Sequence, residues 1–198
     1  ASLGIGILRF DFMGLGESAG NFEDTSVSSN ISDIVSAYNF LRKNFTPPPS
    51  LLIGHSLGGL ASLYALEKTP SIKACVTLNA PSSTIHTAKR FAQDKTKVLE
   101  NGFGELDIMG KIYRVKSTFL KDLEKYFSLQ LDFIKIPVMV AHVLNDPIVP
   151  YSHGLDIFNQ LKSPKSLISL DEMDHLLKNR DHAEQVAHMI YGWTKRYL

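Results

Sequence analysis

A serine set among glycines, between an apolar run and a helical stretch, is the feature that most constrains this chain. The segment Gly54-His55-Ser56-Leu57-Gly58-Gly59 follows the apolar run Leu51-Leu52-Ile53 and precedes a helix predicted over 57–67. A strand that turns sharply into a helix strains the backbone at the serine, and flanking side chains would collide there. Glycine at positions 54 and 58 removes that collision. The hydroxyl of Ser56 then lies at the carboxyl end of the strand, beside the positive end of the helix dipole.

The rest of the chain alternates short apolar runs with longer amphipathic runs, which predicts an α/β fold with a mostly parallel sheet. Besides 51–53, we expect strands at Gly4–Phe12, Lys73–Leu78, Ile136–Leu144 and Ser166–Leu170. One-sided apolar spacing predicts helices over Ile31–Phe45, Leu155–Leu161 and Ala183–Trp193. Asn30 is the expected N-cap of the first of these helices. Helices on both faces of the sheet would make a three-layer α/β/α sandwich.

Residues 82–135 interrupt this alternation. They contain a hairpin, from Leu106 to Val115, and a following helix with aromatic and aliphatic side chains on one side. We therefore divide the chain into an α/β core, residues 1–81 and 136–198, and a small lid or cap insertion, residues 82–135. The insertion is expected to lie over one edge of the sheet and to shape a substrate pocket. A surface excursion with no role in the site is the alternative.

A serine nucleophile needs a general base, and the base needs an acid that orients it. Asp146 follows the strand predicted at 136–144, and His175 follows the strand predicted at 166–170. Because the carboxyl ends of parallel strands share one rim of a sheet, we expect both residues to converge on Ser56. The chain order of nucleophile, acid and histidine is that of α/β-hydrolases. The backbone N–H of Leu57 is the expected oxyanion donor.

Other residues compete for these roles. Asp146 stands before a proline, where an aspartate commonly opens a turn. Asp174 is the main rival acid and Asp171 the next, and we expect Asp174 to shape its loop. His55 lies inside the glycine-rich turn, where a packing role is expected, and His142 lies within a strand. The remaining histidines fall in loops or helices with no visible partner in the sequence: His86, His153, His182 and His188.

One stretch near the start imitates a cofactor motif. Gly14-x-Gly16-x-x-Ala19 follows a predicted strand, as a dinucleotide-binding fingerprint does. That fingerprint requires a helix that begins inside the glycines and holds a pyrophosphate at its N-terminus. Helical periodicity begins here only at Ile31, and no Cys/His pattern has zinc-site spacing. We therefore expect no cofactor and no metal.

Charge and hydropathy argue against several classes of partner. The 21 Lys and Arg against 20 Asp and Glu give a net charge of +1, too small to attract nucleic acid or an anionic membrane at long range. No apolar run reaches the roughly 18–20 residues of a membrane span. The single cysteine, Cys75, cannot form an internal disulfide, and the segment Ala1–Gly4 lacks signal-peptide features. We expect a cytoplasmic chain that acts on a small-molecule acyl substrate, with no nucleic-acid or membrane partner. The sequence is silent on oligomeric state.

These residues resemble the α/β-hydrolase superfamily. The resemblance rests on the pattern D-x-x-G-x-G-x-S from Asp11 to Ser18, on the segment 54–59, and on the acid and histidine at 146 and 175. A closer likeness is to the hydrolase module that many bacteria carry fused to an OsmC-like domain. Four stretches look like that module: Arg9–Ser18, Leu51–Gly59, Pro164–Ser166 and Asp174–Leu177. The resemblance implies a serine hydrolase, usually of esters, that uses no cofactor.

The resemblance also implies a strand and a helix before the equivalent of Gly4–Asp11, with a loop that supplies a second oxyanion donor. This chain starts too late to contain them, so either it is a fragment or the strands at 4–12 and 51–53 pair directly. The combined interpretation is a serine hydrolase of carboxylic esters that works through an acyl-enzyme. A non-catalytic binding module with this fold is one alternative, and a peptidase or thioesterase with the same triad is another.

Overall fold

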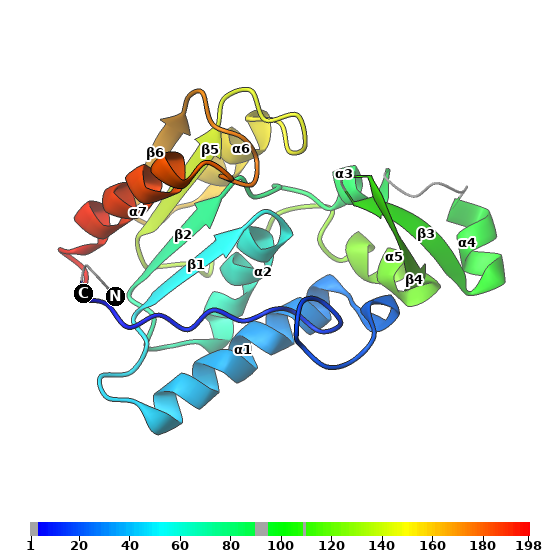
Figure 1. Ribbon diagram of the computed structural model, residues 1–198, viewed down its shortest axis with the longest axis horizontal. Coiled ribbons are helices and arrows are strands. Elements are labelled where there is room, and N and C mark those ends of the chain that lie inside the picture. The colour runs from blue at the N-terminus through cyan, green and yellow to red at the C-terminus, as the bar shows by residue number, and fades with distance from the viewer. Residues whose placement is uncertain (1–3, 90–94, 109) are drawn as a thin grey trace.

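The computed structural model describes residues 4–89, 95–108 and 110–198 (Figure 1). In this part of the chain the central sheet has four parallel strands in the order β1-β2-β5-β6. The strands are β1 Leu51–His55, β2 Ala74–Leu78, β5 Val138–Val143 and β6 Lys165–Leu170. Every residue of β5 is buried, as expected for a central parallel strand that is covered on both faces.

Helices cover both faces of the sheet (Figure 1). Residues of α2 (Leu57–Ala65) and α6 (Ser152–Gln160) pack with Val138 and Val140 of β5. Residues of α7 (Arg180–Thr194) pack with Met139 and Ala141 of the same strand, on the opposite face. Successive side chains of a strand point to opposite faces, so this alternation builds two apolar layers. The predicted three-layer α/β/α sandwich is confirmed.

The longest helix, α1 (Val27–Asn44), packs beside α2 and begins earlier than the sequence predicted. The Ser26 hydroxyl accepts a hydrogen bond from the Ser29 N–H, and the Ser29 hydroxyl accepts one from the Ser26 N–H. This capping box satisfies the free amide groups at the helix start. The prediction of Asn30 as N-cap is therefore wrong, and Asn30 lies inside the helix with its side chain buried.

The first predicted strand is also wrong. Residues 4–12 are assigned no strand, and among the described residues β1 pairs only with β2. A strand exists only where its backbone groups join a ladder, and this segment joins none. Its apolar side chains are correspondingly open, with Ile7 77% exposed. The alternative in which 4–12 pairs directly with 51–53 is not what the structure has.

The insertion forms a small unit outside the central sheet, next to the amino-terminal end of α1 (Figure 1). Its elements are α3 Ile85–Ala88, α4 Lys95–Asn101, β3 Phe103–Ile108, β4 Lys111–Lys116 and α5 Ser117–Glu124. The predicted hairpin is confirmed, because β3 and β4 pair in antiparallel fashion with Leu106 opposite Tyr113. On α5, the Asp122 carboxylate accepts hydrogen bonds from the backbone N–H (2.8 Å) and the hydroxyl (2.6 Å) of Ser28, which ties the insertion to α1.

Two single-turn 3₁₀ helices complete the described elements, η1 at Phe22–Asp24 and η2 at Leu66–Lys68. The first of them meets the hairpin of the insertion. Lys116 of β4 forms an ion pair with Asp24, and Arg114 lies 3.8 Å from the carboxylate of Glu23. The insertion is therefore held by the chain segment that leads into α1 as well as by α1 itself.

Candidate functional site

Ser56 lies in a strained turn between β1 and α2. Its backbone has φ 51° and ψ −130°, a conformation that residues other than glycine rarely adopt. The turn is fixed on both sides, because the Ser56 N–H donates to the Leu78 carbonyl (2.8 Å) and the Ser56 carbonyl accepts from Gly59 N–H (2.8 Å). The serine hydroxyl is thereby presented at the carboxyl end of the sheet.

Close packing around α2 explains two of the glycines near the serine, Gly54 and Gly59. A Cβ atom at Gly54 would lie 2.4 Å from both the Gly58 carbonyl oxygen and the Ser62 hydroxyl. The role predicted for Gly54 is confirmed. At Gly58 a Cβ would meet only the Phe12 ring, at 3.3 Å. The second tight position is instead Gly59, where a Cβ would lie 2.6 Å from the Cβ of Ala80.

The structure brings Ser56, His175 and Asp146 into one hydrogen-bonded chain. His175 Nδ1 lies 2.6 Å from Asp146 Oδ2, and His175 Nε2 lies 3.1 Å from the Ser56 hydroxyl oxygen. An ionised carboxylate only accepts, so Nδ1 carries the proton and Nε2 is left to accept from the serine hydroxyl. The other oxygen of Asp146 accepts from the N–H groups of Ile148 and Val149, at 2.8 and 3.0 Å, which fixes the carboxylate in its loop.

The rival acids bond to the backbone of their own loop. Asp174 accepts from the N–H groups of Leu176 (2.9 Å) and Lys178 (3.1 Å), in keeping with the loop-shaping role expected of it. Asp171 accepts from the N–H of Glu172 at 3.0 Å. Asp146 is the acid whose carboxylate reaches the ring of the site histidine.

His55 is more than the packing residue that the sequence suggested. Its ring lies 4.9 Å from the ring of His175, centroid to centroid, and its Nε2 lies 2.6 Å from the His175 backbone oxygen. Burial lowers the pKa of His55 below its usual value. The ring is therefore neutral near pH 7, and because a carbonyl only accepts, Nε2 carries the proton that it donates.

Asn79, which sequence reasoning passed over as the end of a strand, also holds His175. Its Nδ2 donates to the His175 carbonyl (2.9 Å), while its Oδ1 accepts from the Val143 N–H (2.8 Å) at the end of β5. Asn79 is fully buried and has a φ of 49°. The available signal was an asparagine directly after a strand, since asparagine tolerates this left-handed conformation better than most residues.

A second cluster of serine, histidine and aspartate lies at the start of the insertion. The Ser82 hydroxyl is 2.8 Å from His153 Nδ1 and 3.1 Å from Asp156 Oδ2. The backbone N–H of Ser82 also donates to His153 Nδ1, at 3.1 Å. That nitrogen is thus already engaged by the backbone, and the serine bonds the aspartate directly. This cluster links α6 to the segment after β2. It does not form the chain from aspartate through histidine to serine that is present at Ser56.

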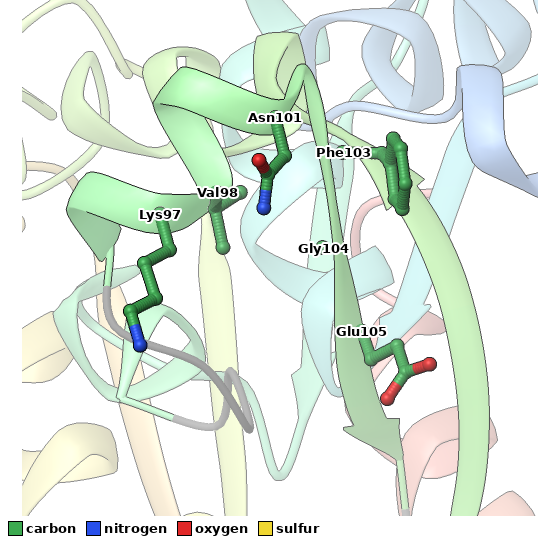
Figure 2. A pocket seen from close by; sticks show the side chains of 6 residues that line it. All are labelled: Lys97, Val98, Asn101, Phe103, Gly104 and Glu105. Atoms are coloured by element: carbon green, nitrogen blue, oxygen red, sulfur yellow. The ribbon is translucent and has the colours of Figure 1, made fainter.

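Ser56 and His175 open into a cavity of about 400 Å³, within the usual range for small-molecule sites. Its walls are mainly apolar. They come from the loop 12–22, from the insertion and from the Asp146 loop: Phe12, Phe22, Leu106, Phe119, Ile148 and Val149. A smaller hollow of about 80 Å³ lies between α4 and β3, with Lys97 and Glu105 on opposite sides (Figure 2). No serine, cysteine or histidine is among the described residues that line it.

The pattern D-x-x-G-x-G-x-S helps to form the wall of the larger cavity, the one beside Ser56 and His175. The carboxylate of Asp11 accepts from the Glu17 N–H at 3.4 Å, and a Cβ at Gly16 would lie 2.1 Å from the same oxygen. The closed loop brings Phe12 and Leu15 to the cavity wall. After the single turn η1, the first α-helix that follows begins at Val27.

The sequence profile of the prolyl oligopeptidase family matches residues 1–198. The chain belongs to the prolyl oligopeptidase family. Within the described residues, this family member has an α/β fold with a parallel central sheet, as its structural neighbours do.

Three relatives illustrate the likeness of this family member to known proteins. The mitochondrial palmitoyl-protein thioesterase ABHD10 of Mus musculus is 26% identical over 187 residues, which cover 90% of this chain and 62% of that protein. The chain thus spans about six tenths of the length of this curated relative. An esterase domain from Rhodothermus marinus is 34% identical, with a TM-score of 0.72, over 90% of this chain and 73% of that one. Mouse alpha/beta hydrolase domain-containing protein 10 superposes with a TM-score of 0.75 at 22% identity, over 95% of this chain and 77% of that one.

Two features are absent from the described part of this family member. No three His, Cys, Asp or Glu side chains there are grouped in a way that could hold a metal ion. No helix in the same residues has the length and apolar character needed to cross a membrane.

Proposed function

We propose that this prolyl oligopeptidase family member hydrolyses carboxylic esters, with Ser56 as nucleophile, His175 as general base and Asp146 as the acid that orients it. The observation that carries the proposal is the hydrogen-bonded chain from Asp146 through His175 to Ser56, which opens on an apolar cavity. A binding module would have no physical need for a strained serine, an imidazole nitrogen facing it and a buried carboxylate behind that imidazole.

In the proposed reaction the Ser56 oxygen attacks the acyl carbon while its proton passes to His175 Nε2. The carbonyl oxygen becomes an oxyanion, and the N–H of Leu57 stabilises it. Leu57 is the first residue of α2, so the preceding chain offers no helical carbonyl to its N–H, and the helix dipole favours negative charge there. The alcohol leaves with the proton from His175. Water then attacks the acyl carbon and gives a proton to His175 Nε2. The bond between that carbon and the Ser56 oxygen breaks, His175 returns the proton to Ser56, and the carboxylic acid leaves.

We assign residues 82–135 to a lid over the proposed site. Two observations support this role: Leu106 and Phe119 of the insertion line the same cavity as Ser56, and Asp122 ties the insertion to α1. The lid would enclose the apolar part of the substrate and exclude water from the acyl-enzyme until the alcohol has left.

The test is the pair Ser56→Ala and Ser82→Ala. Ser56→Ala should lower kcat for p-nitrophenyl butyrate by at least about 10³-fold, with the unfolding midpoint unchanged. Ser82→Ala is the matched control, because Ser82 also bonds a histidine and an aspartate. It should retain turnover. A fluorophosphonate probe should label Ser56 in the wild-type chain. Turnover that survives in Ser56→Ala, or a label on Ser82, would refute the assignment.

Thioester hydrolysis is the second candidate, favoured by the palmitoyl-protein thioesterase name of the mouse relative. The same triad can attack an ester, a thioester or a peptide, so a panel of matched acyl esters, acyl thioesters and peptide anilides separates these reactions.

Cytoplasmic location stays a prediction, as does the likeness to modules fused to OsmC-like domains.

A further inference from the structure

The cavity beside Ser56 contains a polar pair that the proposed reaction does not use. Thr25 and Asn30 both line it, and each is only 5% exposed. The Thr25 hydroxyl donates to Asn30 Oδ1 at 3.3 Å. Among the described residues, the Asn30 Nδ2 group donates to no acceptor. The pair therefore places an unused amide donor against a cavity whose other walls are mainly apolar.

Helix formation gives no reason for an asparagine at position 30. The capping box is made by Ser26 and Ser29, and the backbone N–H of Asn30 already donates to the Ser26 carbonyl at 3.0 Å. The neighbouring helix positions Val27 and Ile31 are filled by core side chains. Asn30 Nδ2 is not among the fully buried polar atoms that lack a partner, so this amide is accessible from the cavity that Asn30 lines. A polar group that is accessible in a mainly apolar cavity is typical of a binding site.

We propose that Thr25 and Asn30 form a polar subsite that binds a hydroxyl group on the otherwise apolar part of the substrate. A ligand hydroxyl accepts from Asn30 Nδ2 and donates to the free lone pairs of the Thr25 oxygen. If the carboxamide is turned round, its oxygen faces the ligand and accepts from that same hydroxyl, so the chemistry holds for both orientations. The inference rests on the proposed function and narrows it to esters of hydroxylated acyl or alcohol groups.

The experiment compares matched substrates on the full chain. One arm uses p-nitrophenyl octanoate against octanoates with a hydroxyl at the chain end or one or two carbons before it. The other arm uses hexyl butyrate against hydroxyhexyl butyrates, so that the two arms show whether the subsite reads the acyl or the alcohol group. The wild-type chain should favour the best hydroxylated ester by about tenfold in kcat/KM in one arm.

Three variants locate the effect. Asn30→Leu should bring this preference close to one, because leucine offers the ligand hydroxyl neither a donor nor an acceptor. Thr25→Val should reduce the preference in part, and it serves as the second variant if Asn30→Leu folds poorly. Thr87→Val is the matched control, because Thr87 lines the same cavity, and it should keep the wild-type preference.

The outcomes separate the two proposals. If Ser56→Ala still hydrolyses either ester, the proposed function fails. If turnover depends on Ser56 but no hydroxyl position is preferred in either arm, the subsite is refuted alone. The subsite is also refuted if Asn30→Leu slows plain and hydroxylated esters equally, because a merely structural residue would affect both.

Discussion

Replacing Asn79 tests how the site histidine is held. Its side chain bridges the His175 carbonyl and the Val143 N–H, and its backbone has a φ of 49°. Asn79→Ala removes both hydrogen bonds and puts alanine, which tolerates the left-handed region less well than asparagine, at this position. Asn79→Gly removes the same bonds without that strain. Asn79→Asp keeps the acceptor for Val143 but loses the donor to His175.

The magnitudes follow from these contacts. A buried N–H left without its acceptor costs about 1–3 kcal/mol of unfolding free energy. The left-handed conformation costs alanine about a further 1–2 kcal/mol, which glycine does not pay. We therefore expect a loss of about 1–3 kcal/mol in Asn79→Gly and about 2–5 kcal/mol in Asn79→Ala. His55 still donates to the His175 carbonyl in every variant. The histidine loop should therefore loosen rather than detach, and kcat should fall by about tenfold.

Urea unfolding followed by circular dichroism gives the stability of each variant, and p-nitrophenyl butyrate hydrolysis gives kcat and KM. The comparison of Asn79→Gly with Asn79→Ala isolates the backbone strain, and Asn79→Asp isolates the contact with His175. Equal stability of the glycine and alanine variants would refute the strain argument. A destabilised Asn79→Asp with wild-type kcat and KM would show that Asn79 does not position His175.

Three further predictions concern other contacts. Gly59→Ala and Ala80→Gly should couple by about 1–3 kcal/mol in a double-mutant cycle of urea unfolding, because their Cβ atoms would otherwise lie 2.6 Å apart; additive values would refute the clash. Burial raises the pKa of the Cys75 thiol to about 12, so iodoacetamide should label it only after denaturation, and rapid labelling of the native chain would contradict this. Burial disfavours the Asp122 carboxylate, but hydrogen bonds from Lys125 and Ser28 outweigh it and lower the pKa. Its stabilisation should therefore be complete above the pKa of an unfolded aspartate and be lost as pH falls through the lower folded value. Asp122→Asn should flatten the acid limb of the stability profile, and an unchanged limb would refute the link.

The short-range features of the site were open to prediction from the sequence. The turn at Ser56 is encoded by an apolar run, two close-packed glycines and a helical stretch, all within about 15 residues. The positions of Asp146 and His175 followed from the rule that parallel strands end at one rim. The second close-packed glycine was misassigned, because Gly58 and Gly59 are adjacent and only the contact with Ala80, in the segment after β2, distinguishes them.

The sequence by itself determined the four strands of the central sheet, the strained serine and the residues that follow the strands. These depend on local backbone preference and hydrophobic period, which neighbouring residues carry. Only the tertiary structure decided that Gly4–Phe12 stays unpaired, that His55 and Asn79 share the His175 carbonyl, and that Asn30 faces a cavity rather than capping a helix. Such contacts join residues far apart in the chain. Whether they form depends on strand register and on which edge of the sheet a segment pairs with. The residue spacing within one segment specifies neither.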